Sequence, residues 1–294
     1  MEEVKETQAV HDVVELEKQY LLGTYARFPV VFTKGKGVFV EDINKKKYLD
    51  MISGLGVNAL GHAHPRIVKV IRDQAAKVVH ISNLYYNQYQ GPLAKKLIEY
   101  SGLARVFFSN TGTEAIDGAI KFARAFGHKV GGDGKFKLVA ATNSFHGRTY
   151  GGMSLTATAK YRDDFKPLLE GVTFIPLNDV EALRQAVDDS TCGVFLETVQ
   201  GEGGIFECTS EFLQTARLVC NQHRAALVLD EIQCGLGRTG EMFAFKHHGA
   251  VPDILTIAKP LAAGLPLGVQ LIGRWQADEE LLACAEQVET ALHE

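Results

Sequence analysis

The stretch ALVLDEIQCGLGRTG, residues 226–240, begins with a short apolar run and then becomes polar and rich in glycine. Apolar runs of the same kind recur along the chain, at 105–109, 137–142, 171–176, 193–198, 253–258 and 269–273. Helical patterns lie between several of them, at 114–126, 178–188 and 210–223. Such alternation is typical of a mostly parallel sheet with helices on both faces, so the sequence predicts an α/β fold.

The first part of the chain has a different pattern. Residues 13–22 have the apolar spacing of an amphipathic helix, and residues 37–51 form two short strand-like runs around a polar turn. The alternation of strands and helices begins at about residue 64. We therefore expect an N-terminal helix and β-ribbon segment over 1–63, a large domain over 64–273 and a short helical tail over 274–294.

Composition excludes several classes of protein. The 294 residues include 46% hydrophobic and 22% charged residues, close to globular averages. A net charge of −4 gives no basic field for nucleic acid or an anionic membrane surface, and the apolar runs are too short to span a bilayer. The acidic N-terminus lacks the features of a secretory signal, and the five cysteines are widely spaced. We expect a cytoplasmic protein without nucleic-acid, membrane or metal partners.

Polar residues follow the predicted strands, where ligands collect in open α/β sheets. Asp230 ends the run 226–230, and a buried carboxylate needs a cationic or hydrogen-bonding partner. A protonated pyridine nitrogen would be such a partner, and a salt bridge or a metal ion remains an alternative. Lys259 follows the run 253–258. Desolvation at such a strand end favours loss of the lysine's proton, and the neutral amine can form an imine. A lysine that extends into solvent is the alternative.

The segment SNTGTE, residues 109–114, leads into the predicted helix 114–126. Thr111 and Glu114 fit a capping box, and the short side chains of Gly112 and Thr113 leave the first N–H groups accessible to a phosphate. An ordinary capped helix is the alternative interpretation.

Two further segments carry candidate side chains. In 143–149, Phe145 could stack on an aromatic ring and the planar guanidinium of Arg148 suits a carboxylate, whereas His146 is expected only to support that ring or the neighbouring loop. The alternative for Phe145 is packing in the core, and the alternative for Arg148 is a surface charge. Glu197 and Glu202 lie in a strand end and a glycine-rich loop, where they could orient groups or neutralise an arginine, or simply be solvated.

Five segments in a fixed order carry a family resemblance: SNTGTEA, SFHGRT, ETVQGEGG, LDEIQCGLGRTG and LTIAKPLAAGLPLG. In this order they resemble the class III aminotransferases of the ornithine and acetylornithine type, whose fold is the large domain of fold-type I pyridoxal-phosphate enzymes. NALGHAHP at 58–65 and HISNLYY at 80–86 extend the resemblance, which covers about residues 30 to 272.

The resemblance implies pyridoxal 5′-phosphate as the cofactor, Lys259 as the Schiff-base lysine and Asp230 as the partner of the ring nitrogen. The implied cofactor-binding residues also include Gly112, Thr113, Phe145, Ile232 and Gln233, and the implied substrate-binding residues are Arg148, Glu197 and Glu202.

The implied reaction moves an amino group from N-acetylornithine, or a related ω-amino donor, to 2-oxoglutarate, in arginine biosynthesis and in a homodimer. Ornithine, succinylornithine, 4-aminobutyrate and carrier-bound lysine remain alternative donors.

The sequence departs from the family pattern after PLG, at 266–268. There the family continues into a second phosphate-binding threonine motif and a C-terminal domain whose arginine pairs with the residue matching Glu202; we expect a chain without either. Two hypotheses follow: an active aminotransferase, or a catalytically impaired homologue that binds cofactor or a partner subunit without efficient turnover. A dinucleotide-binding dehydrogenase is excluded because no GxGxxG follows an early strand.

Overall fold

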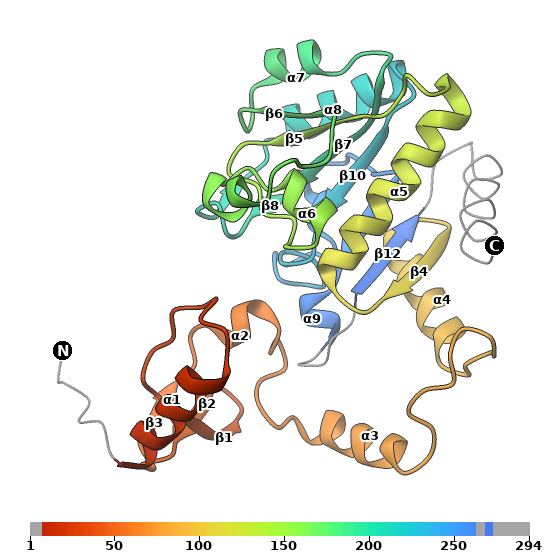
Figure 1. Cartoon of the computed structure of the whole chain (residues 1–294). Helices are drawn as coiled ribbons and strands as arrows, with labels where there is room; N and C mark the ends of the chain where they lie inside the picture. The colour runs from red at the N-terminus through yellow and green to blue at the C-terminus, as the bar shows by residue number, and fades with distance from the viewer. Residues whose placement is uncertain (1–7, 263–267, 273–294) are drawn as a thin grey trace. The chain divides into compact units, whose positions relative to one another are not determined.

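The computed structural model describes residues 8–262 and 268–272 and divides the chain into two compact units, Met1–Tyr85 and Tyr86–Glu294. Figure 1 shows the elements of both. The first unit contains α1 (Gln8–Tyr20), β1 (Phe32–Lys36), β2 (Phe39–Asp42), β3 (Lys47–Leu49), α2 (Ser53–Gly56) and α3 (Pro65–Ala75).

The strands of the first unit form an antiparallel sheet in the order β1-β2-β3. Its polar turn closes on Asp42, which is 2% exposed and accepts hydrogen bonds from the backbone N–H groups of Asn44 and Lys46 and from the Tyr48 hydroxyl. The two predicted strands around a turn are confirmed. The predicted helix 13–22 is present but begins and ends earlier than expected.

The second unit begins with α4 (Gln90–Ser101). Its other long elements are β4 (Arg105–Ser109), α5 (Gly112–Gly131), β5 (Lys137–Ala141), α6 (Tyr150–Leu155), β6 (Val172–Ile175), α7 (Val180–Ala186), β7 (Thr191–Glu197), α8 (Ser210–Gln222), β10 (Ala226–Asp230), β11 (Ile254–Ile257) and β12 (Gly268–Ile272). Short pieces complete it: η1 (Ala159–Tyr161), η2 (Asp163–Phe165), β8 (Val199–Gln200), β9 (Phe206–Glu207), η3 (Ala244–His247) and α9 (Lys259–Ala262).

Across the described residues, seven strands form one sheet in the order β4-β12-β11-β10-β7-β5-β6. The pairs β11/β10, β10/β7, β7/β5 and β5/β6 are parallel, and β12 is antiparallel to both of its neighbours. The prediction of a mostly parallel α/β sheet is therefore confirmed. All seven predicted strands are present, with ends that differ by at most two residues.

The core lies on both faces of the central strands β7 and β10, which are buried along their whole length. Along β10, Leu227 and Leu229 pack into a cluster with α7 and α8, whereas Ala226 and Val228 pack into a second cluster with α5. Side chains of a strand alternate between faces, so an unbroken apolar run forms when helices cover both. Figure 1 shows α5 and α8 against this sheet.

The helices follow the predicted pattern with different ends. The helix predicted over 114–126 is longer at both ends, Gly112–Gly131, and the one predicted over 178–188 is shorter, Val180–Ala186. Among the described residues, no helix has the length and apolar character required to cross a membrane. The tail predicted over 274–294 lies outside the described residues, and the domain boundary at 63/64 stays a prediction.

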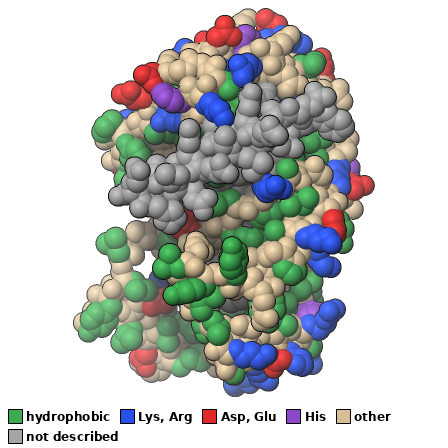
Figure 2. All heavy atoms as spheres, turned by 90° about the vertical axis from the view of Figure 1, so that its right-hand side faces the viewer, with side chains coloured by type: hydrophobic (Ala, Val, Ile, Leu, Met, Phe, Trp, Pro, Cys, Tyr) green, Lys and Arg blue, Asp and Glu red, His purple; other side chains and the backbone are tan. Residues whose placement is uncertain are grey.

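Large apolar side chains are exposed along the first unit. Leu22, Phe28 and Met51 are each more than 80% exposed, and Val10 is the buried hydrophobic residue found in the described part of this unit. The space-filling view in Figure 2 likewise shows many hydrophobic side chains on the face that it draws. The first unit therefore has little apolar core of its own, and the large core belongs to the second unit.

Candidate active site

The candidate site begins at the ends of neighbouring parallel strands. Asp230, the last residue of β10, lies opposite Glu197, the last residue of β7, and opposite Thr256 of β11. Lys259 follows Thr256 three residues later, just beyond the end of β11. Parallel strands end at the same edge of a sheet, so side chains far apart in sequence are brought together there.

Asp230 is 5% exposed and is held by two neighbours. The backbone N–H of Ile232 donates to its Oδ1 at 3.0 Å, and Nδ1 of His146 lies 2.8 Å from its Oδ2. His146 is itself buried, with an edge-to-face contact to Phe195, and its Nε2 has no hydrogen-bond partner among the described residues. Burial alone would lower the pKa of His146, but the hydrogen bond to Asp230 and the charges of Asp230 and Glu197 raise it above its ordinary value.

Glu197 is buried beside this pair. It is 6% exposed and its Oε2 accepts the backbone N–H of Phe145 at 3.0 Å. Burial, reinforced by the charges of Asp230 and Glu202, raises the pKa of Glu197 to about 8, against the opposing effects of His146 and of the Phe145 hydrogen bond. Two carboxyl groups side by side in a poorly solvated site do not both ionise easily, which explains the direction of this shift.

Lys259 is partly buried at the N-terminus of α9, and its backbone N–H donates to the backbone oxygen of Ile232 at 3.2 Å. Burial lowers the pKa of the Lys259 amine below its usual value, aided by the charge of Arg238, while the carboxylates of Glu202, Asp230 and Glu197 oppose this shift. An amine with a lowered pKa is deprotonated more readily and is the form that attacks a carbonyl group.

Of the capping box predicted at the N-terminus of α5, only the hydrogen bond to the Thr111 side chain is present. Thr111 Oγ1 accepts the N–H of Glu114 at 3.2 Å, but the Glu114 carboxylate accepts the N–H of Asn110 rather than that of the cap residue. The backbone N–H groups of Gly112 and Thr113 find no acceptor among the described residues. The positive end of a helix with unpaired N–H groups can bind an anion such as a phosphate.

The loop 143–149 packs tightly against this helix end. Gly147 has φ +115°, and a Cβ added there would lie 2.1 Å from Thr113 Oγ1. The Thr149 hydroxyl lies 2.7 Å from the same Thr113 oxygen, and the Thr149 N–H donates to it at 3.2 Å. The loop backbone is thereby fixed against the first turn of α5.

Phe145 and Arg148 of this loop both contact Tyr161. The Phe145 and Tyr161 rings lie edge to face, 5.8 Å apart, and Cζ of Arg148 lies 4.8 Å from the centre of the Tyr161 ring. The two aromatic residues are half-buried, whereas Arg148 is exposed.

The remaining predicted residues lie near the same edge. Ile232 packs on the helix N-terminus, since a Cβ at Gly112 would lie 2.9 Å from its Cγ2. The Gln233 side-chain amide donates to Glu202 Oε1 at 3.3 Å, in the turn between β8 and β9. Glu202 thus has a neighbouring amide as a hydrogen-bond partner, a contact that the sequence did not predict.

The sequence interpretation missed two buried residues of the site region. His146 was expected to support the ring or the neighbouring loop, and its contact with the Asp230 carboxylate was not predicted. Glu231 is fully buried and accepts hydrogen bonds from the N–H groups of Ala244 and Phe245, and burial raises its pKa to about 7. A histidine inside a recognised motif was a usable signal for the first; no local pattern distinguishes Glu231 from a surface glutamate.

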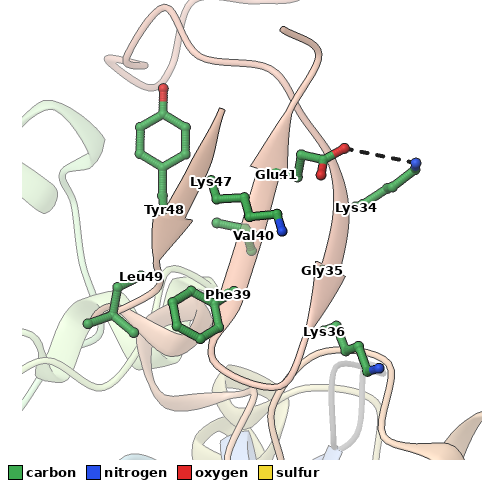
Figure 3. Close-up of a pocket in the computed structure, with 9 residues that line it drawn as sticks. All are labelled: Lys34, Gly35, Lys36, Phe39, Val40, Glu41, Lys47, Tyr48 and Leu49. Carbon is green, nitrogen blue, oxygen red and sulfur yellow. Dashed lines mark ion pairs between the residues drawn. The ribbon is translucent and has the colours of Figure 1, made fainter. Parts of the chain in front are cut away.

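A separate hollow of about 710 Å³ lies on the small sheet of the first unit. Figure 3 shows its lining from β1, β2 and β3, with Lys34 paired to Glu41. None of the predicted site residues lines it. Titratable groups with shifted pKa values converge instead at the strand ends of the second unit, and we take these strand ends as the candidate site.

Fold and site together are those of a fold-type I enzyme, and the aminotransferase class III family model matches residues 23–278. The chain belongs to the class III aminotransferases, a pyridoxal-phosphate-dependent family. It is 49% identical over 259 residues to the acetylornithine aminotransferase of Methanocaldococcus jannaschii, covering 88% of this chain and 65% of that relative. It is 46% identical to the acetylornithine aminotransferase of Caldanaerobacter subterraneus subsp. tengcongensis, covering 87% of this chain and 65% of that relative.

Solved structures agree with this assignment. The ornithine aminotransferase from Toxoplasma gondii superposes with a TM-score of 0.87 at 33% identity, covering 95% of this chain and 66% of that one. The acetylornithine aminotransferase from Elizabethkingia anophelis gives 0.79 at 28% identity, covering 94% and 66%. The chain spans about 65% of the length of the curated relatives that it matches.

The residues present fit pyridoxal phosphate on observations made in this structure. Asp230 is a buried carboxylate suited to a cationic ring nitrogen, the N–H groups of Gly112 and Thr113 are available to a phosphate, and the Lys259 amine has a lowered pKa. These three features lie at the ends of β10 and β11 and at the start of the helix that follows β4.

Proposed function

We propose that the chain is a pyridoxal-phosphate-dependent aminotransferase that transfers an amino group from N-acetylornithine, or a related ω-amino donor, to 2-oxoglutarate. The observation that carries this proposal is the position of a buried Asp230 at the end of β10 and of Lys259 just beyond the end of the adjacent parallel strand β11. A carboxylate and a desolvated amine in neighbouring positions are the two groups that this chemistry requires.

When bound, pyridoxal phosphate supplies an electron sink for the charge that develops at a substrate Cα. Asp230, oriented by His146 and Ile232, holds a protonated ring nitrogen. Lys259 would hold the cofactor through its side-chain amine, and the same amine could accept and return a proton at the reacting carbon of the substrate. Gly112 and Thr113 bind the phosphate through the N-terminus of α5, whose partial positive charge favours it.

Phe145 would pack on the cofactor ring, and Arg148 would bind a substrate carboxylate through its planar guanidinium. Ile232 and Gln233 contact the cofactor beside Asp230, and Glu197 and Glu202 border the substrate. Under this proposal the donor's carboxylate would bind on the Tyr161 side of the loop 143–149, where Arg148 is exposed.

The donor is proposed from the relatives. The curated relatives from Methanocaldococcus jannaschii and Caldanaerobacter subterraneus are acetylornithine aminotransferases, and one from Pseudomonas aeruginosa is named as a succinylornithine transaminase and acetylornithine aminotransferase. These names support N-acetylornithine first and related donors second. A cytoplasmic homodimer that serves arginine biosynthesis completes the proposal.

The first experiment compares wild-type protein with Lys259→Ala after addition of pyridoxal phosphate. Attachment of the cofactor to Lys259 gives a visible absorbance band. Borohydride removes this band and leaves the cofactor covalently bound to the protein. Lys259→Ala is expected to give neither the band nor the covalently bound cofactor. Lys121→Ala, at an exposed lysine of α5, is the matched control and keeps the band. A band that survives in Lys259→Ala contradicts the assignment.

Turnover separates the two hypotheses about activity. Conversion of N-acetylornithine that depends on 2-oxoglutarate supports the aminotransferase. A cofactor band without such turnover supports instead a homologue that binds cofactor without efficient catalysis. Kinetic constants measured for each donor then identify the preferred donor. A preference for 4-aminobutyrate contradicts the N-acetylornithine assignment.

A further inference from the structure

Tyr161, the last residue of η1, has no role in the proposed reaction, yet its ring contacts two proposed site residues. Phe145 meets it edge to face, with ring centres 5.8 Å apart and planes at 77°. The Arg148 guanidinium lies over it, 4.8 Å from the ring centre. One partly buried ring thus connects the residue proposed to stack on the cofactor with the residue proposed to bind a carboxylate.

The segment that carries Tyr161 is fixed to the loop that carries the other two. Ser144, which immediately precedes Phe145, donates through its hydroxyl to the Leu155 backbone oxygen at 2.8 Å and accepts the Ala157 N–H through its own backbone oxygen at 3.1 Å. The Tyr161 N–H then donates to the backbone oxygen of Thr158 at 3.0 Å. The ring is therefore held at a set position relative to the loop 143–149.

A carboxylate-binding arginine gains affinity when its side chain is ordered before the ligand arrives, because ordering it on binding costs conformational entropy. A guanidinium that rests on an aromatic face is ordered in this way, with an effect of about 3- to 30-fold on an equilibrium. Lys160 adds a second cation, with its Nζ 4.8 Å from the centre of the same ring.

We propose that Tyr161 is a positioning residue whose ring holds Arg148 and Phe145 in place, so that an amino-acid carboxylate meets a preordered guanidinium. The inference rests on the proposed function. The contacts that carry it involve the aromatic ring rather than the Tyr161 hydroxyl. Tyr161→Phe therefore preserves this platform, and aliphatic substitutions remove it.

Arginine labelling tests the platform without any ligand. The protein is treated with phenylglyoxal, and modification of Arg148 is followed by peptide mass spectrometry, with the exposed Arg184 of α7 as internal reference. Tyr161→Leu is expected to raise Arg148 labelling relative to Arg184 by about threefold or more, as loss of a cation–π contact implies. Tyr161→Phe and the control Tyr100→Leu, at an exposed tyrosine of α4, are expected to match wild type.

Unchanged Arg148 labelling in Tyr161→Leu overturns the proposal, as does an equal rise in Tyr161→Phe. If Tyr161→Leu does not fold, which loss of the wild-type circular dichroism spectrum reveals, Tyr161→Met replaces it, since its flexible side chain fills the space without a ring. The same outcomes are then decisive for that variant.

Calorimetric binding of 2-oxoglutarate to the cofactor-loaded protein provides the second measurement. Tyr161→Leu is expected to weaken 2-oxoglutarate binding about 5- to 30-fold while the affinity for pyridoxal phosphate changes less. Equal losses of both affinities indicate a structural role and overturn the proposal. If wild type binds neither molecule, the proposed function fails, and the labelling result still decides the role of Tyr161.

Discussion

Gly147 is the residue at which the loop 143–149 meets the proposed phosphate-binding region. Its φ of +115° lies where side chains other than glycine are strained, and a Cβ at this position would lie only 2.1 Å from Thr113 Oγ1. The close approach of the loop to α5 therefore requires glycine here. Arg148 and His146 flank Gly147, so a backbone shift at this position moves both.

Gly147→Ala is expected to lower the free energy of unfolding by about 2–4 kcal/mol, because strain and a backbone shift add together. Gly102→Ala is the matched control: Gly102 also has a positive φ, +77°, but its added Cβ meets nothing within 4 Å. That control is expected to cost only about 1 kcal/mol. Urea unfolding measures both, and equal costs would show that the contact with Thr113 contributes nothing.

His146 interacts with two buried carboxyl groups, those of Asp230 and Glu197. It contacts Asp230 directly, and its charge also acts on Glu197, so it reduces the repulsion between carboxyl groups that end adjacent strands. The sequence placed His146 in the right motif but not in this role, since the partner lies 84 residues away.

The register of β7 and β10 places Glu197 opposite Asp230, and this makes the stability of the folded protein depend on pH. The pKa of Glu197 is about 8 in the folded protein, against an ordinary value of 4.5. The folded state therefore holds this proton more tightly than the unfolded state. The resulting stabilisation is complete below about pH 4.5 and is lost as the pH rises to about 8.

Glu197→Gln cannot titrate, and its amide oxygen can still accept the Phe145 N–H. The free energy of unfolding of this variant, relative to wild type, is therefore expected to increase as the pH rises from about 5 to about 8, by at most about 1.4 kcal/mol per pH unit. Urea unfolding across this range measures it, with Glu211→Gln, on the exposed surface of α8, as the reference for the substitution itself. A difference that is constant or decreases with pH contradicts the burial of a proton on Glu197.

The whole chain distributes its apolar core unevenly. β7 and β10 are buried along their length, whereas β1 and β3 of the first unit have no buried residue. Local opening costs less free energy where few apolar side chains are buried.

Hydrogen exchange followed by mass spectrometry is therefore expected to show fast exchange in β1 and β3 and the slowest exchange in β7 and β10. The comparison is made within one protein, so solution conditions are identical for all four strands. Protection of β1 and β3 equal to that of β7 contradicts the expectation, and shows that other contacts stabilise the first unit.

Sequence alone was enough to predict the α/β class, the polar residues at the strand ends and the family, because alternating apolar runs and ordered motifs are local and can be read without coordinates. It also singled out Asp230 and Lys259 as candidate residues, since each lies at the end of a recognisable apolar run. The tertiary structure was needed to show that His146 holds Asp230, that Glu197 is buried beside it and that Tyr161 contacts Arg148. These contacts join residues that are separated in sequence or depend on burial, and neither property is encoded in the spacing of a short segment.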